Sequence, residues 1–203
     1  MSYASQVRVP LQFNAQAREG RRLNVATFLT ETSQPGPGQT GFDEPGGIGD
    51  GADAALVGWA GFEWKSFCRE PSTPTESQFG EWGACKTGYS SNWDGEWPSQ
   101  AFQSANARTY APAIAGTAVS MYYNVTSFEF ELVYDATAAT TEGNLTEIFV
   151  WPDHYPNGLN LTTSVSGGNG TAVATYDGNS SVTVVLDADL GWRITVSIAP
   201  LDS

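Results

Sequence analysis

The chain has 203 residues, with 9 Lys and Arg against 22 Asp and Glu, and a formal net charge of −13. This acidic balance excludes binding of a nucleic-acid backbone through a basic surface, and it disfavours contact with anionic lipid headgroups. One His and two Cys are too few for a zinc finger or an all-histidine metal site, and no apolar run approaches the roughly 20 residues that span a bilayer.

The first 34 residues predict two strands. Residues 6–13 alternate, with the apolar positions from Val7 to Phe13 on one face and Pro10 on the other. Proline cannot donate to a strand ladder, so this segment is expected to be an edge strand or a docking arm. Residues 23–31 predict the second strand. The candidate residues of an assembly arm are Tyr3, Val7, Val9 and Leu11.

Residues 35–112 have no sustained periodicity. They begin with Gly- and Pro-rich turn chemistry and continue with a segment, 59–102, that is dense in aromatic residues. Cys68 and Cys85 lie in this segment. In an oxidising compartment they would form a disulfide that closes a Trp-rich loop, whereas in a cytoplasm they would be two reduced thiols. The Gly-rich surroundings favour the disulfide.

Residues 113–203 predict a near-continuous series of strands. The run SFEFELVYD places Phe128, Phe130, Leu132 and Tyr134 on one face, which is the pattern of a half-buried antiparallel strand. Similar alternation recurs over 158–165, 181–187 and 192–198, and Asp177-Gly178 indicates a tight turn. The last runs are spaced about ten residues apart, as in a sandwich or barrel.

These patterns predict an all-β fold: one antiparallel β-sandwich domain over residues 1–203, of jelly-roll or immunoglobulin-like type. It would be built from 1–34 and 113–203, with 35–112 as a loop-rich aromatic insertion. The alternative is two domains divided near residue 112. Two strands alone are marginally stable, so the N-terminal pair is expected to join the sandwich. No long helix is expected.

The Trp and Glu residues of the aromatic segment could bind sugars or carry out hydrolysis. Three Glu-Trp pairs occur in the aromatic segment, and glycosidases use two carboxylates beside an aromatic platform, but the spacing fixes no such pair. Carbohydrate binding is favoured over hydrolysis, but the preferred interpretation of these rings is the small core of a loop-rich insertion. The two uses can coexist if some rings face inward and others outward. The glycan-binding candidates are Trp59, Trp64, Trp82, Trp93, Trp97, Glu81 and Glu96.

The remaining polar candidates are weaker. The sole histidine, His154, is expected to pack in a loop, because its sequence-adjacent Asp153 cannot orient the ring as a catalytic triad requires. Asp43, Asp50 and Asp53 could bind calcium from a Gly-rich loop, but a solvated acidic loop is the preferred interpretation. No cofactor is expected.

Asn-X-Ser/Thr sequons occur at Asn124, Asn144, Asn160, Asn169 and Asn179, all in the second half of the chain. A coincidence of turn and strand residues is the favoured explanation, and glycosylation in an extracellular setting is the alternative. The start MSYASQVRVPLQF lacks the basic and apolar regions of a secretory signal, so the numbered chain is expected to be made without one.

The chain resembles an accessory virion protein of a tailed bacterial or archaeal virus, such as a head-decoration, spike or fibre component. The resemblance depends on three features: the start without a signal peptide, the N-terminal arm with Pro10, and the series of strands over 127–200. The resemblance implies a non-catalytic structural or adhesive component of a multimeric virion or cell-surface assembly. Its partners would be other copies of the chain, further assembly proteins and cell-surface glycans. The alternative is a carbohydrate-binding module or, less favoured, a glycoside hydrolase.

Overall fold

A long amphipathic helix, α1 (Tyr3–Leu23), opens the computed structural model, which describes residues 3–33, 47–62, 107–137, 145–167, 170–187 and 191–201. Phe13, Ala17 and Gly20 are buried at helical spacing, so one face of α1 packs inward. The strand expected over 6–13 is therefore wrong. The alternation of apolar residues from Val7 to Phe13 is too short to distinguish a strand from a helix. Leu11, which was expected on the apolar face of the strand, is 63% exposed.

The end of α1 is a Schellman motif. Asn24 adopts a left-handed conformation with φ 54°, its N–H donates to the Arg21 carbonyl, and the Val25 N–H donates to the Gly20 carbonyl. A Cβ on Gly20 would lie 2.6 Å from the Thr27 side chain, so this close approach requires glycine. The motif turns the chain back into the first strand.

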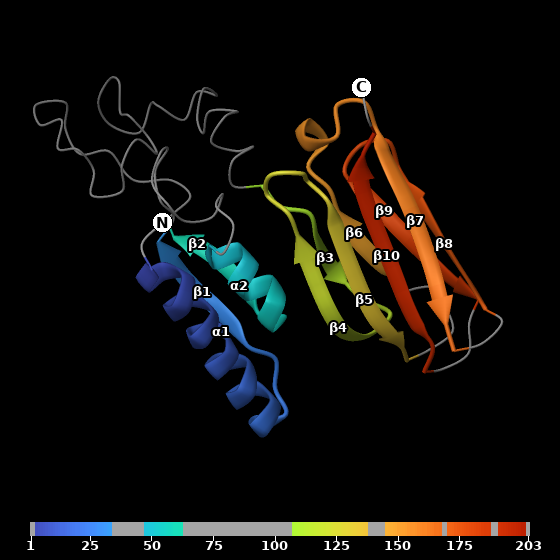
Figure 1. Cartoon of the computed structure of the whole chain (residues 1–203). Helices are drawn as coiled ribbons and strands as arrows, with labels where there is room; N and C mark the ends of the chain where they lie inside the picture. Colours follow the sequence, from blue (N-terminus) through green and yellow to red (C-terminus); the bar gives the residue numbers. More distant parts are fainter. Residues whose placement is uncertain are drawn as a thin grey trace, which may run out of the picture. The chain divides into compact units, whose positions relative to one another are not determined.

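A parallel strand pair follows α1. Strand β1 (Phe28–Ser33), helix α2 (Ile48–Ala55) and strand β2 (Gly58–Phe62) follow in sequence, and β1 pairs with β2 in parallel (Figure 1). Parallel neighbours need a crossover connection, and α2 lies within it. The expectation that N-terminal strands join the sandwich is wrong, because β1 pairs with β2 in a separate two-stranded sheet.

Helix α2 lies where the sequence predicted only loop. Its sequence, IGDGADAA, does not predict a helix, because glycine is a poor helix former. Burial of Ala52 and Ala55 on one side of the helix stabilises it in the folded chain. The helix ends, like α1, with a left-handed residue: Leu56 has φ 55° and the Val57 N–H donates to the Ala52 carbonyl. No helix in the described part of the chain is long and apolar enough to cross a membrane.

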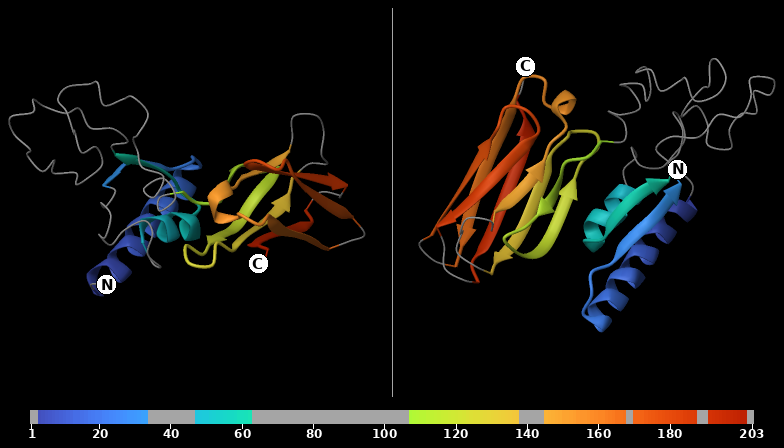
Figure 2. Two further views of the ribbon diagram at one scale, coloured as in Figure 1. Left: turned by 90° about the horizontal axis from the view of Figure 1, so that it is seen from above. Right: turned by 180° about the vertical axis from the view of Figure 1, so that it is seen from behind.

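The second unit is a sandwich of two four-stranded sheets. The described residues before 107, apart from 53–56, form one compact unit, and residues 53–56 form a second unit with the described residues from 107 onward. The sheets of the second unit have the orders β4-β5-β10-β7 and β3-β6-β9-β8, with antiparallel neighbours (Figure 2). The strands are β3 (Tyr110–Ala113), β4 (Gly116–Tyr123), β5 (Phe130–Ala136), β6 (Thr146–Phe149), β7 (Leu159–Ser166), β8 (Thr171–Tyr176), β9 (Ser181–Asp187) and β10 (Arg193–Pro200).

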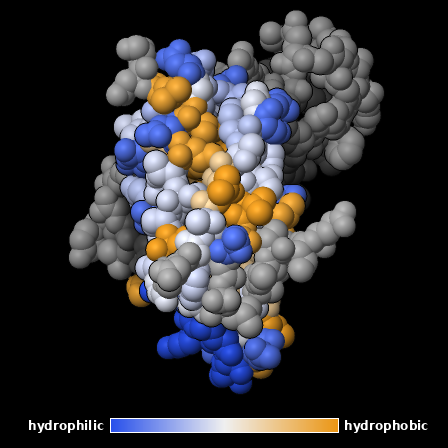
Figure 3. All heavy atoms as spheres, turned by 90° about the vertical axis from the view of Figure 1, so that its right-hand side faces the viewer, coloured by the Kyte–Doolittle hydropathy of each residue, from blue (hydrophilic) through white to orange (hydrophobic). Residues whose placement is uncertain are grey.

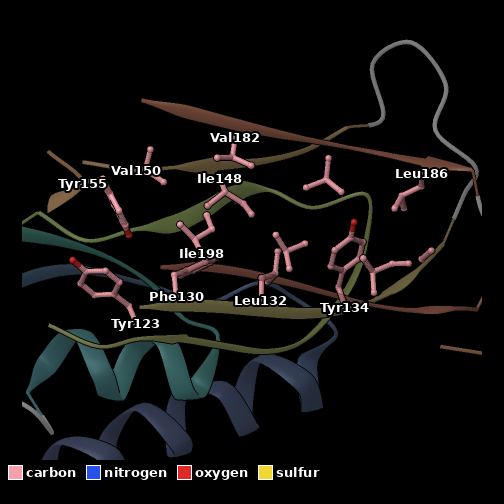
Figure 4. Packing of buried hydrophobic residues seen from close by; sticks show 14 residues of the cluster. Tyr123, Phe130, Leu132, Tyr134, Ile148, Val150, Tyr155, Val182, Leu186 and Ile198 are labelled. Atoms are coloured by element: carbon pink, nitrogen blue, oxygen red, sulfur yellow. The ribbon is translucent and has the colours of Figure 1, made fainter. Parts of the chain in front are cut away.

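The β-sandwich predicted from the sequence is thus confirmed, but all eight of its described strands come from residues after 107. Alternating side chains of both sheets point inward and fill the space between them, as Figure 4 shows. The predicted inward faces of 130–134, 182–186 and 194–198 are confirmed as buried. The core comprises Tyr123, Phe130, Leu132, Tyr134, Ala136, Ile148, Val150, Tyr155, Val182, Val184, Leu186, Ile194, Val196 and Ile198.

The predicted turn at Asp177-Gly178 joins β8 to β9. The Asp177 carboxylate accepts hydrogen bonds from the backbone N–H groups of Asn179, Ser180 and Ser181, and these lower its pKa. Gly178 has φ +82°, a conformation that glycine adopts without steric cost.

Replacing Leu132 with alanine tests the core. Leu132 is 0% exposed on β5, so Leu132→Ala should lower the free energy of unfolding by about 2–5 kcal/mol in urea denaturation. Glu131→Ala changes the exposed neighbour on the same strand and should cost no more than about 0.5 kcal/mol. Equal unfolding midpoints for the two variants would show that this strand is not central.

Candidate functional site

The carboxyl end of the parallel pair is the first candidate site. In α/β folds, ligands bind at the carboxyl ends of parallel strands, where the following loops begin. Glu31 is the third residue from the end of β1. Leu29 pairs with Trp59 and Thr32 with Gly61, so β1 carries one more residue than β2 between these pairs, at Thr30 and Glu31. Such a bulge is frequent next to active sites.

Most of the predicted sugar-binding residues lie in the part of the chain that the structure does not describe. Trp64, Trp82, Trp93, Trp97, Glu81 and Glu96 lie outside the described residues, as do Cys68 and Cys85. Trp59 is half-buried in β2, opposite Leu29 of β1. The arm residues Tyr3, Val7 and Val9 lie in α1 rather than in a strand. Their roles stay predictions.

The calcium candidates are not part of a described metal site. Asp50 and Asp53 lie on α2 rather than in a loop, and Asp43 lies outside the described residues. The Asp53 carboxylate instead accepts a hydrogen bond of 2.7 Å from Arg108, and both side chains are buried. Within the described ranges, no three His, Cys, Asp or Glu residues are grouped so that they could hold a metal ion.

The second candidate site is a buried polar cluster at one end of the sandwich. His154 ends a short 3₁₀ turn, Pro152–His154, and is 4% exposed. Its Nδ1 shares a hydrogen bond of 2.8 Å with the Tyr123 hydroxyl. Its ring stacks on Phe128, with 4.2 Å between the ring centres and 6° between their planes. The arrangement is that of a packed histidine, as the sequence predicted.

Tyr155 joins the same cluster to two loops. Its hydroxyl donates to the Phe128 carbonyl at 2.8 Å and lies 2.8 Å from the Thr109 hydroxyl. Phe128 has φ +58°, which is strained for an aromatic residue. The stacking on His154 and the hydrogen bond from Tyr155 hold this conformation. Figure 4 shows Tyr123 and Tyr155 at the end of the core opposite Leu186.

Burial controls the ionisation of both tyrosines. Burial raises the pKa of Tyr155 to about 12, against a partial opposing effect of the Thr109 hydroxyl. Burial also raises the pKa of Tyr123, and the nearby Tyr155 adds to this effect. The guanidinium carbon of Arg108 lies 5.0 Å from the centre of the Tyr123 ring, in cation–π geometry. The cluster is therefore built to hold neutral phenols, which suits a structural role.

Comparisons with known proteins point to glycosidases. Residues 108–198, the sandwich, match the family model of the glycoside hydrolase family 5 C-terminal domain. An endoglycoceramidase from Hydra vulgaris is 29% identical over 157 residues, which cover 73% of this chain and 25% of that protein. The chain thus spans about a quarter of the curated relative.

Two groups of solved structures share the fold. Endo-glycoceramidase II from Rhodococcus sp., solved as a lactosyl–enzyme intermediate, has a TM-score of 0.59 and 18% identity, covering 98% of this chain and 39% of that one. Sterylglucosidase 1 from Cryptococcus neoformans has a TM-score of 0.56 and 13% identity, covering 96% of this chain and 33% of that one.

These findings overturn the resemblance to a virion protein and the structural or adhesive function that it implied. The expectation of a non-enzymatic protein is wrong too, because the matched family and relatives are glycoside hydrolases. The resemblance misled because it depended on a strand-rich pattern that many unrelated sandwiches share. Glu31 was not singled out, because its position becomes informative only when β1 is known to pair in parallel.

Removing the Tyr123 hydroxyl should destabilise the sandwich. Tyr123→Phe leaves the buried Nδ1 of His154 without that partner, so the free energy of unfolding should fall by about 1–3 kcal/mol in urea denaturation. Tyr122→Phe, next along β4 and 54% exposed, is the matched control and should have little effect. If Tyr123→Phe lowers the free energy of unfolding no more than Tyr122→Phe does, the hydrogen bond between Tyr123 and His154 does not stabilise the sandwich.

Alkaline pH should weaken the fold. Below pH 10 the Tyr155 phenol is neutral in both the folded and the unfolded chain. Above pH 10 it ionises in the unfolded chain, whereas in the folded chain its pKa of about 12 keeps it neutral. Stability should therefore fall as the pH rises from 10 through 12. Tyr155→Phe should make this fall shallower in denaturation curves taken at several pH values. An unchanged slope would show that Tyr155 ionises as easily in the folded state.

Proposed function

We propose that this chain acts in glycoside hydrolysis, as the carboxyl-terminal part of a glycosidase that releases sugar from a lipid-linked acceptor. The match of the sandwich to the glycoside hydrolase family 5 C-terminal domain carries the proposal. The names of the relatives, endoglycoceramidase and sterylglucosidase, denote enzymes of sugar-bearing lipids and support the substrate class.

The parallel unit supports a catalytic contribution from this chain. Glycosidases place two carboxylates beside the scissile bond, and barrel enzymes carry catalytic residues at the carboxyl ends of their strands. Glu31 lies near the carboxyl end of β1, which pairs in parallel with β2, and at a bulge of that pairing. We assign to Glu31 one of the two carboxylates. The second carboxylate and further barrel strands would come from outside the described residues.

In this proposal Glu31 is the nucleophile. Its carboxylate would attack the anomeric carbon, the glycosidic C–O bond would break, and the second carboxylic acid would protonate the departing lipid alcohol. Water would then hydrolyse the glycosyl ester and free Glu31. The Rhodococcus endo-glycoceramidase II has been solved as a lactosyl–enzyme intermediate, and a glycosyl–enzyme stage of this kind is what the proposal requires of the present chain.

Replacing Glu31 tests the assignment directly. In the protein that carries this chain, isolated from its cells, Glu31→Gln should lower kcat on a fluorescent glycosylceramide by about three orders of magnitude or more, since the carboxylate nucleophile is lost. Glu19→Gln, which alters an exposed ion pair with Arg22 on α1, is the control and should keep full activity.

Two further measurements separate a lost nucleophile from a misfolded enzyme. Azide should restore turnover of an activated aryl glycoside by Glu31→Gly, and a 2-deoxy-2-fluoro glycoside should label Glu31 in the unaltered protein. Labelling of a different carboxylate would overturn the assignment of Glu31 while leaving the glycosidase proposal intact. Absence of hydrolysis by the unaltered protein on aryl glycosides and glycosylceramide alike would overturn the proposed function.

A further inference from the structure

Strands β7 and β8 are the last strands of their sheets on the same side of the sandwich. Sheet order places β7 beside β10 and β8 beside β9, so each has one side without a strand partner within the described residues. The Thr163 hydroxyl donates to the Ala172 carbonyl at 2.6 Å and so links the two edges. An edge strand of this kind is a template for pairing with another chain.

This edge lacks the usual protection against such pairing. Natural edge strands carry charges, prolines or bulges, but the sequences LNLTTSVS and TAVATY contain neither a charged residue nor a proline. The pairing of β7 with β10 also runs without a register shift. Figure 3 shows a band of apolar atoms on this side of the molecule, and the paired residues Val173 and Val185 are 58% and 48% exposed.

A sequon lies on the unprotected strand. Asn160 and Thr162 are two residues apart on β7, and both belong to its exposed face. Asparagine is unfavourable in strands, and among the described residues the Asn160 side chain makes no hydrogen bond that would explain its presence. Its neighbour across the sheet is Ala199, a small residue that leaves room for a substituent.

A second exposed sequon follows β8 in the sequence. Asn179 is exposed in the turn to β9, where its backbone N–H is held by Asp177. Asn124 differs, because its side-chain oxygen accepts hydrogen bonds from the backbone N–H groups of Thr126 and Ser127. The β4–β5 turn thus accounts for Asn124 without modification. Asn144 and Asn169 lie outside the described residues.

We propose that Asn160 and Asn179 carry N-linked glycans, and that these cover the β7–β8 edge. In the modification, Nδ2 of asparagine would bond to the anomeric carbon of an oligosaccharide donated by a lipid pyrophosphate. The sugar–phosphate bond breaks, the lipid pyrophosphate leaves, and the amide gives up one proton. The glycans would replace charged residues as the barrier to edge pairing, and this proposal does not depend on the glycosidase activity.

The first test is made on the protein from its own cells. Enzymatic release of N-glycans in ¹⁸O-water converts each modified asparagine to a labelled aspartate, which peptide mass spectrometry detects. We expect the label at Asn160 and Asn179. Unlabelled Asn160 in the complete protein overturns the proposal.

The second test separates the glycan from the side chain. In a secretory eukaryotic host, Thr162→Val destroys the sequon with a residue that favours strands, and Thr162→Ser preserves it. Thr162→Val should lose one glycan-sized step in mass and shift from monomer to larger species in light scattering, whereas Thr162→Ser should do neither. A monomeric Thr162→Val protein would overturn the protective role, and larger species in both variants would indicate a fold defect rather than a missing glycan.

Discussion

The exclusion of water from between two facing sheets is the constraint on which the sandwich depends. β5 and β10 are internal strands of one sheet, and β6 and β9 of the other, so their inward side chains have no route to solvent. Their apolar area supplies the main stabilising term, at about 25 cal/mol per Å² buried. The polar cluster around His154 occurs at the end of this layer, where every buried polar group needs a partner.

The sequence predicted this layer well because its strands alternate strictly. Val182, Val184 and Leu186 stand between polar or exposed residues, and a period of two has few other interpretations. The helices were harder to find. Phe13 and Ala17 set the buried face of α1, but the short alternation before them also fits a strand. In α2, glycine content hid a helix that packing stabilises.

The candidate catalytic residue shows a different limit. Glu31 is the last residue of the strand that the sequence predicts over 23–31, but a carboxylate at the end of a strand is common and indicates no function by itself. The parallel pairing with β2 and the bulge beside it depend on residues about 30 positions away, which no local pattern reveals. His154 was easier to predict, because the prolines on either side, Pro152 and Pro156, place it in a loop.

The path of the chain between the sheets has a consequence for how the sandwich forms. The connections β3 to β4, β5 to β6, β6 to β7, β7 to β8 and β9 to β10 all pass from one sheet to the other. Neither sheet can therefore be completed before the other has begun. The pairing of β5 with β10 joins residues about 60 positions apart, and such distant contacts slow folding into the range of milliseconds to seconds. During synthesis, one edge of β5 has to stay without its partner until β10, the last of the described strands, has been made.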